Sequence, residues 1–247
     1  MINIVIPMAG EGSRFVKAGY EKPKPFIDVA GIPMIERVME NLAYPDARFI
    51  LIGRKDHLKK ESALVEQISK KYNATFIGID KLTEGTACTV LYAKEFIDND
   101  NPLLIANSDQ IVDINIADYI NDCKERNLDG SILTFHDAEM NPKWSFAKTD
   151  EQGLVTFVKE KEAISADATV GIYLYTKGSD YVDAAVQMFI ENDRVNNEFY
   201  TCPTYNYAIA KGKKIGIYDI PSETMHGIGI PEDLNQYLNH MTSSQGR

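Results

Sequence analysis

The first 26 residues constrain the fold of this chain more than any other stretch. A mostly apolar run from Ile2 to Ile6 is long enough for one buried strand, and a turn containing Gly10 and Gly12 follows it. Glycine reaches positive φ and lets the backbone approach a ligand, and successive N–H groups in such a turn can bind an anion. The pattern predicts an anion site at the carboxyl end of a parallel sheet.

Two cations follow that turn and strengthen the prediction. Arg14 carries a fork of donors that suits phosphate oxygens, and Lys24 carries a compact positive charge. Pro23 and Pro25 restrict the backbone around Lys24, so less conformational freedom is lost when this side chain binds. The spacing matches neither the dinucleotide fingerprint nor a P-loop. An ordinary strand-to-helix turn with a solvated arginine is the alternative, but the combined pattern favours a polyphosphate site.

Strand and helix patterns alternate through the rest of the first half. Apolar stretches predict strands and a period near 3.6 predicts helices. The expected strands are 48–53, 74–79 and 102–106, and the expected helices are 33–43, 57–72 and 86–97. The alternation predicts an α/β fold, with a Rossmann-like doubly wound mixed sheet flanked by helices and with ligands beyond the strand ends.

The second half is less regular and richer in β-branched and aromatic residues. The expected strands are 131–135, 154–158, 168–175 and 213–219, and the expected helices are 178–191, 204–210 and 231–241. We expect a smaller β-rich elaboration of the same fold. The whole chain, 1–247, is then one domain with two halves, 1–136 and 137–247.

Composition narrows the class of partner. The net charge of −10 argues against a nucleic-acid-binding or anionic-membrane surface, since either needs a basic face. The three cysteines are too far apart for a disulfide framework or a zinc spacing, which favours the reducing cytoplasm. No signal peptide is recognisable, and no apolar stretch approaches the roughly 20 residues of a membrane-spanning helix. The sequence does not fix the oligomeric state, and a homo-oligomer is one of the alternatives.

A carboxylate directly follows the expected strand at 102–106. Asp109 lies just past this buried run, and Asp113 lies four residues further on. A strand-end carboxylate beside a triphosphate suits Mg²⁺, which takes one or two carboxylates and completes its sphere with phosphate oxygens and water. The alternative is a turn aspartate that caps the next helix or bonds its own backbone. We expect a structural role for Asp113.

Three motifs together resemble the signature of the nucleotidyltransferases that make nucleotide sugars. They are Gly10-x-Gly12-Ser13-Arg14-Phe15, Pro23-Lys24-Pro25-Phe26 and Gly31-Ile32-Pro33-Met34-Ile35. This family includes the sugar-1-phosphate thymidylyl-, uridylyl- and cytidylyltransferases and their choline-phosphate relatives. The resemblance implies that the loop wraps a nucleoside triphosphate (NTP) with Ala9, Gly10, Gly12 and Ser13. It also implies that Arg14 and Lys24 contact the phosphates.

The same resemblance implies that Asp109 binds the metal, with Ser108 in place of the family's glycine. The family's second metal-binding aspartate belongs near the C-terminus, where this chain has Gly227. Either Asp109 works with phosphates and water alone, or another carboxylate substitutes. His226 is a neighbour of this position, although a lone histidine near a loop is usually structural.

Later segments resemble the family more loosely. Glu84, Gly85 and Thr86 match a segment that lies against the nucleobase; Glu84 either accepts from a cytosine amino group or caps the next helix. Glu160 and Lys161 match a run in which the lysine contacts the acceptor phosphate and the glutamate a substrate hydroxyl. The alternative is a solvated charge run in a hairpin. Gly171 lies in the strand that borders the acceptor in the family.

The expected function is a Mg²⁺-dependent nucleotidyltransferase that transfers a nucleoside monophosphate to a small phosphorylated acceptor and releases pyrophosphate. The compact chain resembles bacterial cytidylyltransferases of capsule or surface-polysaccharide synthesis, which favours CTP and an acceptor such as phosphoglutamine or a phosphocholine-like compound. A sugar-1-phosphate enzyme is the runner-up. A glycosyltransferase that uses nucleotide sugars is a further alternative. It would need a metal-binding Asp-x-Asp motif, which Asp109-Gln110-Ile111 does not supply. The glycine at position 227 is the best support for a non-catalytic nucleotide-sensing subunit.

Overall fold

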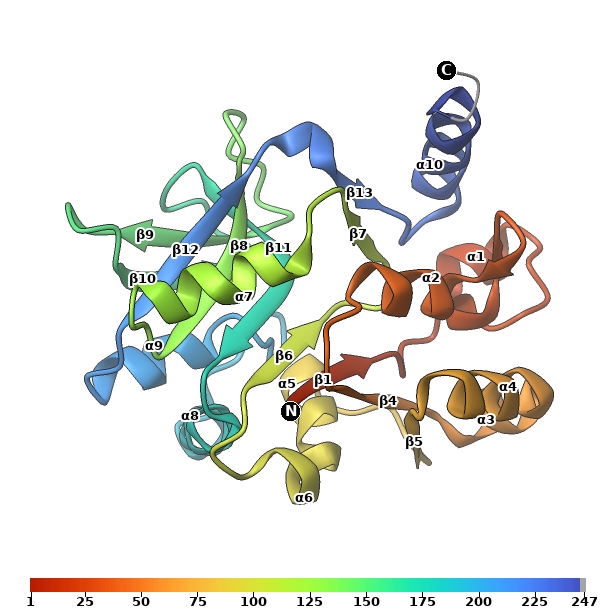
Figure 1. Cartoon of the computed structure of the whole chain (residues 1–247), viewed down its shortest axis with the longest axis horizontal. Helices are drawn as coiled ribbons and strands as arrows, with labels where there is room; N and C mark the ends of the chain where they lie inside the picture. The colour runs from red at the N-terminus through yellow and green to blue at the C-terminus, as the bar shows by residue number, and fades with distance from the viewer. Residues whose placement is uncertain (245–247) are drawn as a thin grey trace.

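The computed structural model describes residues 1–244. Within this range, nine strands form one sheet that crosses the molecule (Figure 1). Its main path runs through β10 (Val155–Glu160), β9 (Ser145–Thr149), β11 (Asp167–Tyr175), β6 (Leu103–Ala106), β1 (Ile2–Pro7), β4 (Ala47–Arg54) and β5 (Thr75–Ile79). β8 (Gly130–His136) branches from β11 and pairs on its other side with β12 (Ile215–Ile220).

Strand direction divides this sheet into two parts. β6, β1, β4 and β5 are all parallel, as the alternating pattern of the first half predicts. β11 joins β6 in antiparallel fashion, and β9 and β10 continue antiparallel beyond it. The predicted fold class, a Rossmann-like mixed sheet flanked by helices with a β-rich elaboration, is confirmed.

Both faces of the sheet are buried, because successive side chains of a strand point to opposite faces. In β1, Ile4 and Ile6 belong to one core cluster and Val5 to the other. The first cluster is covered by helices α1 (Ser13–Lys17), α2 (Met34–Asn41), α4 (Ser62–Tyr72), α7 (Ile116–Glu125) and α10 (Pro231–Ser244). The second is covered by α5 (Thr86–Val90), α6 (Lys94–Ile97), α8 (Gly178–Ile190) and α9 (Thr204–Ala210).

Two helical predictions differ from the structure, and one helix was not predicted. The helix expected at 57–72 is two helices, α3 (Lys55–Lys60) and α4, because Glu61 between them leaves helical geometry at φ −108° and ψ 33°. The helix expected at 86–97 contains a 3₁₀ turn, Leu91–Ala93, between α5 and α6. Helix α7 was not anticipated, although Asn115 caps it by accepting a hydrogen bond from Ala117 N–H.

A small strand pair connects the C-terminal region to the end of β6. β7 (Gln110–Val112) pairs antiparallel with β13 (Met225–Gly227), and α10 packs beside β13. The backbone N–H of Ile228 donates to the carbonyl of Asp109 at 2.9 Å. A second short pair, β2 (Asp28–Val29) and β3 (Ile32–Pro33), leads into α2. Among residues 1–244, no helix combines the length and apolar character needed to cross a membrane.

Candidate active site

A cleft of about 530 Å³ opens at the carboxyl ends of β1 and β6, where a parallel sheet places its ligands. This volume lies in the range of roughly 300–1,000 Å³ typical of small-molecule sites. The side chains and backbone that line the cleft come from two parts of the chain. The N-terminal side is Gly10, Gly12, Arg14, Lys24 and Asp109, and the C-terminal side is Lys143, Glu160, Lys161, Gly171 and Tyr200.

The glycine turn packs against the Pro-Lys-Pro segment, as its sequence suggests. Gly12 has φ 63° and precedes α1, and a Cβ added there would lie 2.9 Å from the Cβ of Lys24. A side chain at position 12 would therefore be strained in the left-handed region and would crowd the Lys24 side chain. Arg14 is exposed, lines the cleft and forms no ion pair within residues 1–244. Ala9 is buried beneath the turn and Ser13 opens α1.

Lys24 and Asp109 meet across 85 positions of sequence. The ammonium Nζ of Lys24 donates to Oδ2 of Asp109, and the two side chains are 19% and 25% exposed. Asp109 thus points into the cleft and holds a cation, rather than capping a helix or turning into the core. The structure brings the three residues expected to be catalytic, Arg14, Lys24 and Asp109, to one wall.

The surroundings of Gly227 offer oxygen ligands in place of the missing aspartate. A Cβ added to Gly227 would lie 3.6 Å from Oδ2 of Asp233 and 3.7 Å from Oε1 of Gln110. Within residues 1–244, the buried Oε1 of Gln110 accepts no hydrogen bond. The Asp233 carboxylate and the unsatisfied Gln110 carbonyl oxygen are oxygen ligands of the kind that Mg²⁺ prefers. The Asp109 carboxylate already contacts a cation, the Lys24 ammonium. The residues present therefore fit a divalent cation.

On the C-terminal side, Glu160 is buried at the end of β10. Its Oε2 accepts a hydrogen bond from Ser145 Oγ, and burial raises the pKa of the carboxyl above its ordinary value of 4.5. Lys161 follows with φ 55°, and its Nζ donates to the hydroxyl of Tyr200 at 2.5 Å. The Lys161 N–H donates to the carbonyl of Trp144. These contacts hold the pair at the cleft, unlike a solvated charge run.

Gly171 lets β11 approach the end of β6. Its φ is 94°, and a Cβ added there would collide with the side-chain amide of Asn107. The backbone N–H of Asn107 donates to the carbonyl of Gly171 at 3.0 Å. Gly171 therefore sets the distance between the antiparallel part of the sheet and the strand that leads to Asp109.

The segment expected to contact the base lies only partly in the cleft. Thr86 lines the cleft, and its hydroxyl accepts a hydrogen bond from Thr201. Glu84 instead forms an ion pair with Arg194 at 2.6 Å, and Gly85 supplies the backbone turn before α5. Among the described residues no side chain caps α5, so Glu84 does not have that role. Its proposed contact with a base stays a prediction.

Sequence reasoning assigned no role to several residues that line the cleft. Lys143 is one, and its Nζ lies 4.5 Å from the ring centroid of Trp144. Its position next to the only tryptophan of the chain was the available signal. Asn107 and Gln110 lie within two positions of Asp109, so the sequence alone indicated that both are close to the site. Asp233, which lies near Gly227 and does not line the cleft, gave no comparable signal, because it reaches Gly227 from the first turn of α10.

The charges of the cleft differ from those of the chain. Arg14, Lys24, Lys143 and Lys161 converge on it in a protein whose net charge is −10. Cations from both sides of one cleft can hold two anionic groups near each other. The arrangement suits a polyphosphate on the N-terminal side and a second phosphorylated molecule on the C-terminal side.

Comparisons with known proteins give a family and several similar proteins. A family model described as nucleotidyl transferase matches residues 4–218. The chain is 24% identical over 239 residues to the UTP--glucose-1-phosphate uridylyltransferase AglF of Haloferax volcanii, covering 94% of this chain and 93% of that protein. It is 29% identical over 121 residues to the bifunctional protein GlmU of Methanococcus vannielii, covering 49% of this chain but only 27% of GlmU.

Solved structures share the fold. The nucleoside-diphosphate-sugar pyrophosphorylase from Vibrio cholerae RC9 superimposes with a TM-score of 0.80 at 27% identity, covering 96% of this chain and 99% of that one. The inositol-1-phosphate CTP transferase from T. maritima gives a TM-score of 0.72 over 98% of this chain and 94% of that one, and at 13% identity this is a likeness of fold alone. Because the family model spans residues 4–218 of 247, this chain belongs to the nucleotidyl transferase family.

Proposed function

We propose that this protein transfers a nucleoside monophosphate from an NTP, with CTP favoured, to a small phosphorylated acceptor and releases pyrophosphate. The observation that carries the proposal is the convergence of Arg14, Lys24 and Asp109 with Glu160 and Lys161 in one cleft. The N-terminal side would bind the NTP and the C-terminal side the acceptor. Residues 1–136 and 137–247 would accordingly act as two halves of one domain.

In this reaction an acceptor phosphate oxygen attacks the α-phosphorus of the NTP, and the bond to pyrophosphate breaks. The nucleophile is already an anion, so the site needs no general base. Catalysis would rest on alignment and on neutralisation of developing charge. Arg14 would hold the departing pyrophosphate and Lys24 the α-phosphate.

Lys161 and Glu160 would position the acceptor. The Lys161 ammonium, held by Tyr200, would bind the acceptor phosphate, and Glu160 would accept a hydrogen bond from an acceptor hydroxyl. The backbone N–H groups near Gly10 and Gly12 would bind the triphosphate, with Ala9 and Ser13 completing the loop. Gly85 and Thr86 would lie against the base.

The metal of this reaction would be Mg²⁺. Asp109 would bind it, with Gln110 and Asp233 as nearby oxygen donors. The ion would add positive charge against the phosphates. The cation already paired with Asp109 in the structure, the Lys24 ammonium, supports this carboxylate as a cation-binding group.

The choice of CTP and the biological setting are the finer part of the proposal. The first candidate is a cytidylyltransferase for capsule or surface-polysaccharide precursors, with an acceptor such as phosphoglutamine or a phosphocholine-like compound. Its three cysteines, all unpaired, agree with work in the reducing cytoplasm. The second candidate is a sugar-1-phosphate uridylyltransferase, which the similarity to AglF along nearly the whole chain favours.

A pyrophosphate-release screen tests both candidates. The four common NTPs would be assayed with Mg²⁺ against sugar-1-phosphates, phosphocholine and phosphorylated amino acids. We expect release to depend on CTP and on one acceptor class. Release only with UTP and a sugar-1-phosphate would replace the first candidate by the second. Tight nucleotide binding without release for any acceptor would support a sensing subunit instead.

A further inference from the structure

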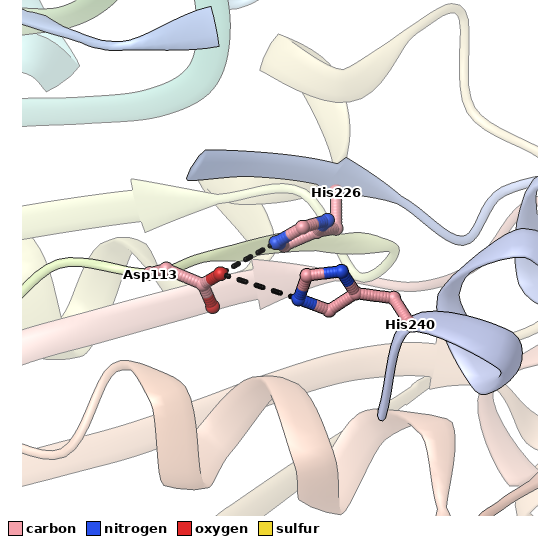
Figure 2. Close-up of side chains that lie close together, drawn as sticks. All are labelled: Asp113, His226 and His240. Atoms are coloured by element: carbon pink, nitrogen blue, oxygen red, sulfur yellow. Dashed lines mark hydrogen bonds and ion pairs between the residues drawn. The ribbon is translucent and has the colours of Figure 1, made fainter. Parts of the chain in front are cut away.

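Three side chains outside the cleft converge from three elements: Asp113 follows β7, His226 lies in β13 and His240 lies in α10. Figure 2 shows both imidazole rings directed at the Asp113 carboxylate. The Nε2 of His226 lies 2.7 Å from Oδ2 of Asp113, and the Nε2 of His240 lies 4.0 Å from the same oxygen. One ligand atom from each residue lies within 4.8 Å of the others.

The fold holds these positions in place. In the β7–β13 register His226 pairs with Ile111, so Asp113 is its diagonal neighbour on the same face of the strand pair. The backbone N–H of Asp113 donates to the carbonyl of Thr224 at 2.8 Å. The buried side chains of Leu234 and Tyr237 anchor α10, which presents His240. Backbone pairing and helix packing therefore fix the positions of the three residues.

The ligand types select a class of ion. Two imidazole nitrogens and one carboxylate oxygen suit Zn²⁺ and similar divalent transition metals, whereas Mg²⁺ takes oxygen ligands. Zinc bonds of about 2.0–2.1 Å in tetrahedral geometry place ligand atoms about 3.3 Å apart. The observed 2.7 and 4.0 Å bracket that separation, so small side-chain rotations would suffice.

We propose that Asp113, His226 and His240 form a binding site for a divalent transition-metal ion of the zinc type, separate from the catalytic cleft. The side chains of Asp113 and His240 are 52% and 53% exposed, which leaves room for a water as the fourth ligand. A bound ion would fasten α10 to the β7–β13 pair. This pair begins one residue after Asp109, so the ion would stabilise the backbone behind that residue.

The test is metal binding by the full-length chain without a histidine tag, after treatment with a chelator. Titration with Co²⁺, followed by its visible absorption, and with Zn²⁺, followed by calorimetry, should each reveal one strong site in the wild type. We expect His240→Ala and Asp113→Asn to weaken this site at least tenfold. They should also abolish the rise in melting temperature that Zn²⁺ produces.

Matched variants distinguish binding at this site from binding elsewhere on the protein. His136 and Asp118 are exposed residues that do not belong to the cluster, so His136→Ala and Asp118→Asn should bind like the wild type. Asp109→Asn should also retain the site, so the result does not depend on nucleotidyl transfer. Circular dichroism would verify folding of each variant. Unchanged Zn²⁺ binding in both His240→Ala and Asp113→Asn, or no binding at micromolar Zn²⁺ by the wild type, would overturn the proposal.

Discussion

The two sides of the cleft are built in different ways. The N-terminal side follows the ends of parallel strands β1 and β6, so short contiguous motifs place Gly12, Arg14 and Asp109. The C-terminal side depends on antiparallel strands and loops far apart in sequence, which bring Lys161 to Tyr200 and Gly171 to Asn107. The difference shows that local sequence motifs position the charged residues on the N-terminal side. Tertiary contacts position them on the C-terminal side. Substitutions should therefore fail in different ways on the two sides.

The largest expected effect is on the N-terminal side. Asp109→Asn removes the charge that seats a cation, and Arg14→Ala removes the proposed clamp on pyrophosphate. Each should lower the rate of pyrophosphate release by about 10²–10³ with little change in unfolding midpoint. The matched controls are Asp118→Asn and Lys17→Ala, whose parent residues are exposed and do not line the cleft. Wild-type turnover in Asp109→Asn would contradict the assignment of this side.

A smaller and more selective effect is expected on the C-terminal side. Lys161→Ala should raise the KM for the acceptor by about 10–100-fold, because a charge-assisted hydrogen bond contributes about 1.5–3 kcal/mol. The KM for the NTP should stay nearly constant. Lys159→Ala is the control, since Lys159 lies in β10 two residues before Lys161 but pairs with Glu162 outside the cleft. A larger change in the KM of the NTP than of the acceptor would reverse the assignment of the two sides.

The contact between Gly171 and Asn107, which connects the two sides of the cleft, should contribute to the free energy of unfolding. Gly171→Ala forces a side chain to φ 94° and against Asn107. Gly212→Ala carries similar strain at φ 81°, but within the described chain no atom lies within 4 Å of the added Cβ. We expect Gly212→Ala to cost about 1 kcal/mol and Gly171→Ala about 1–3 kcal/mol more, in urea unfolding. Equal losses would mean that β11 can move away from Asn107 without penalty.

The smallest expected effect is a pH dependence carried by Glu160. Burial raises the pKa of its carboxyl in the folded protein, so the folded state binds this proton more tightly than the unfolded state. Its contribution is greatest below the unfolded pKa and is lost as pH rises through the folded pKa. Glu160→Gln, which can still accept from Ser145, should lose less stability than the wild type over that interval. Identical pH profiles in denaturant titrations would show that burial does not penalise this charge.

Much of the N-terminal side could be predicted from sequence, because the residues within each of its motifs are adjacent in the chain. The strand, the glycine turn and the Pro-Lys-Pro segment each carry local conformational rules that survive folding. The family resemblance drawn from these motifs is confirmed by the match over residues 4–218.

The rest depended on contacts that local patterns do not encode. The pairing of Glu84 with Arg194 spans 110 positions, and Asp233 meets Gly227 only because α10 packs beside β13. His226 was recognised only as a neighbour of the site, since its partners Asp113 and His240 lie on other elements. Helix α7 was missed, although Asn115 caps it and its apolar residues Ile116, Tyr119 and Ile120 recur at helical spacing. These local signals were sufficient to predict the helix.

The central claim is that the N-terminal side binds a triphosphate opposite Asp109. The most direct measurement is a crystal structure with Mg²⁺ and a CTP analogue that cannot be cleaved between the α- and β-phosphates. We expect the phosphates at the backbone of Gly10 and Gly12 and at Arg14, with the ion on Asp109. At saturating analogue, an empty cleft with Lys24 still paired to Asp109, or a nucleotide bound elsewhere, would contradict the account.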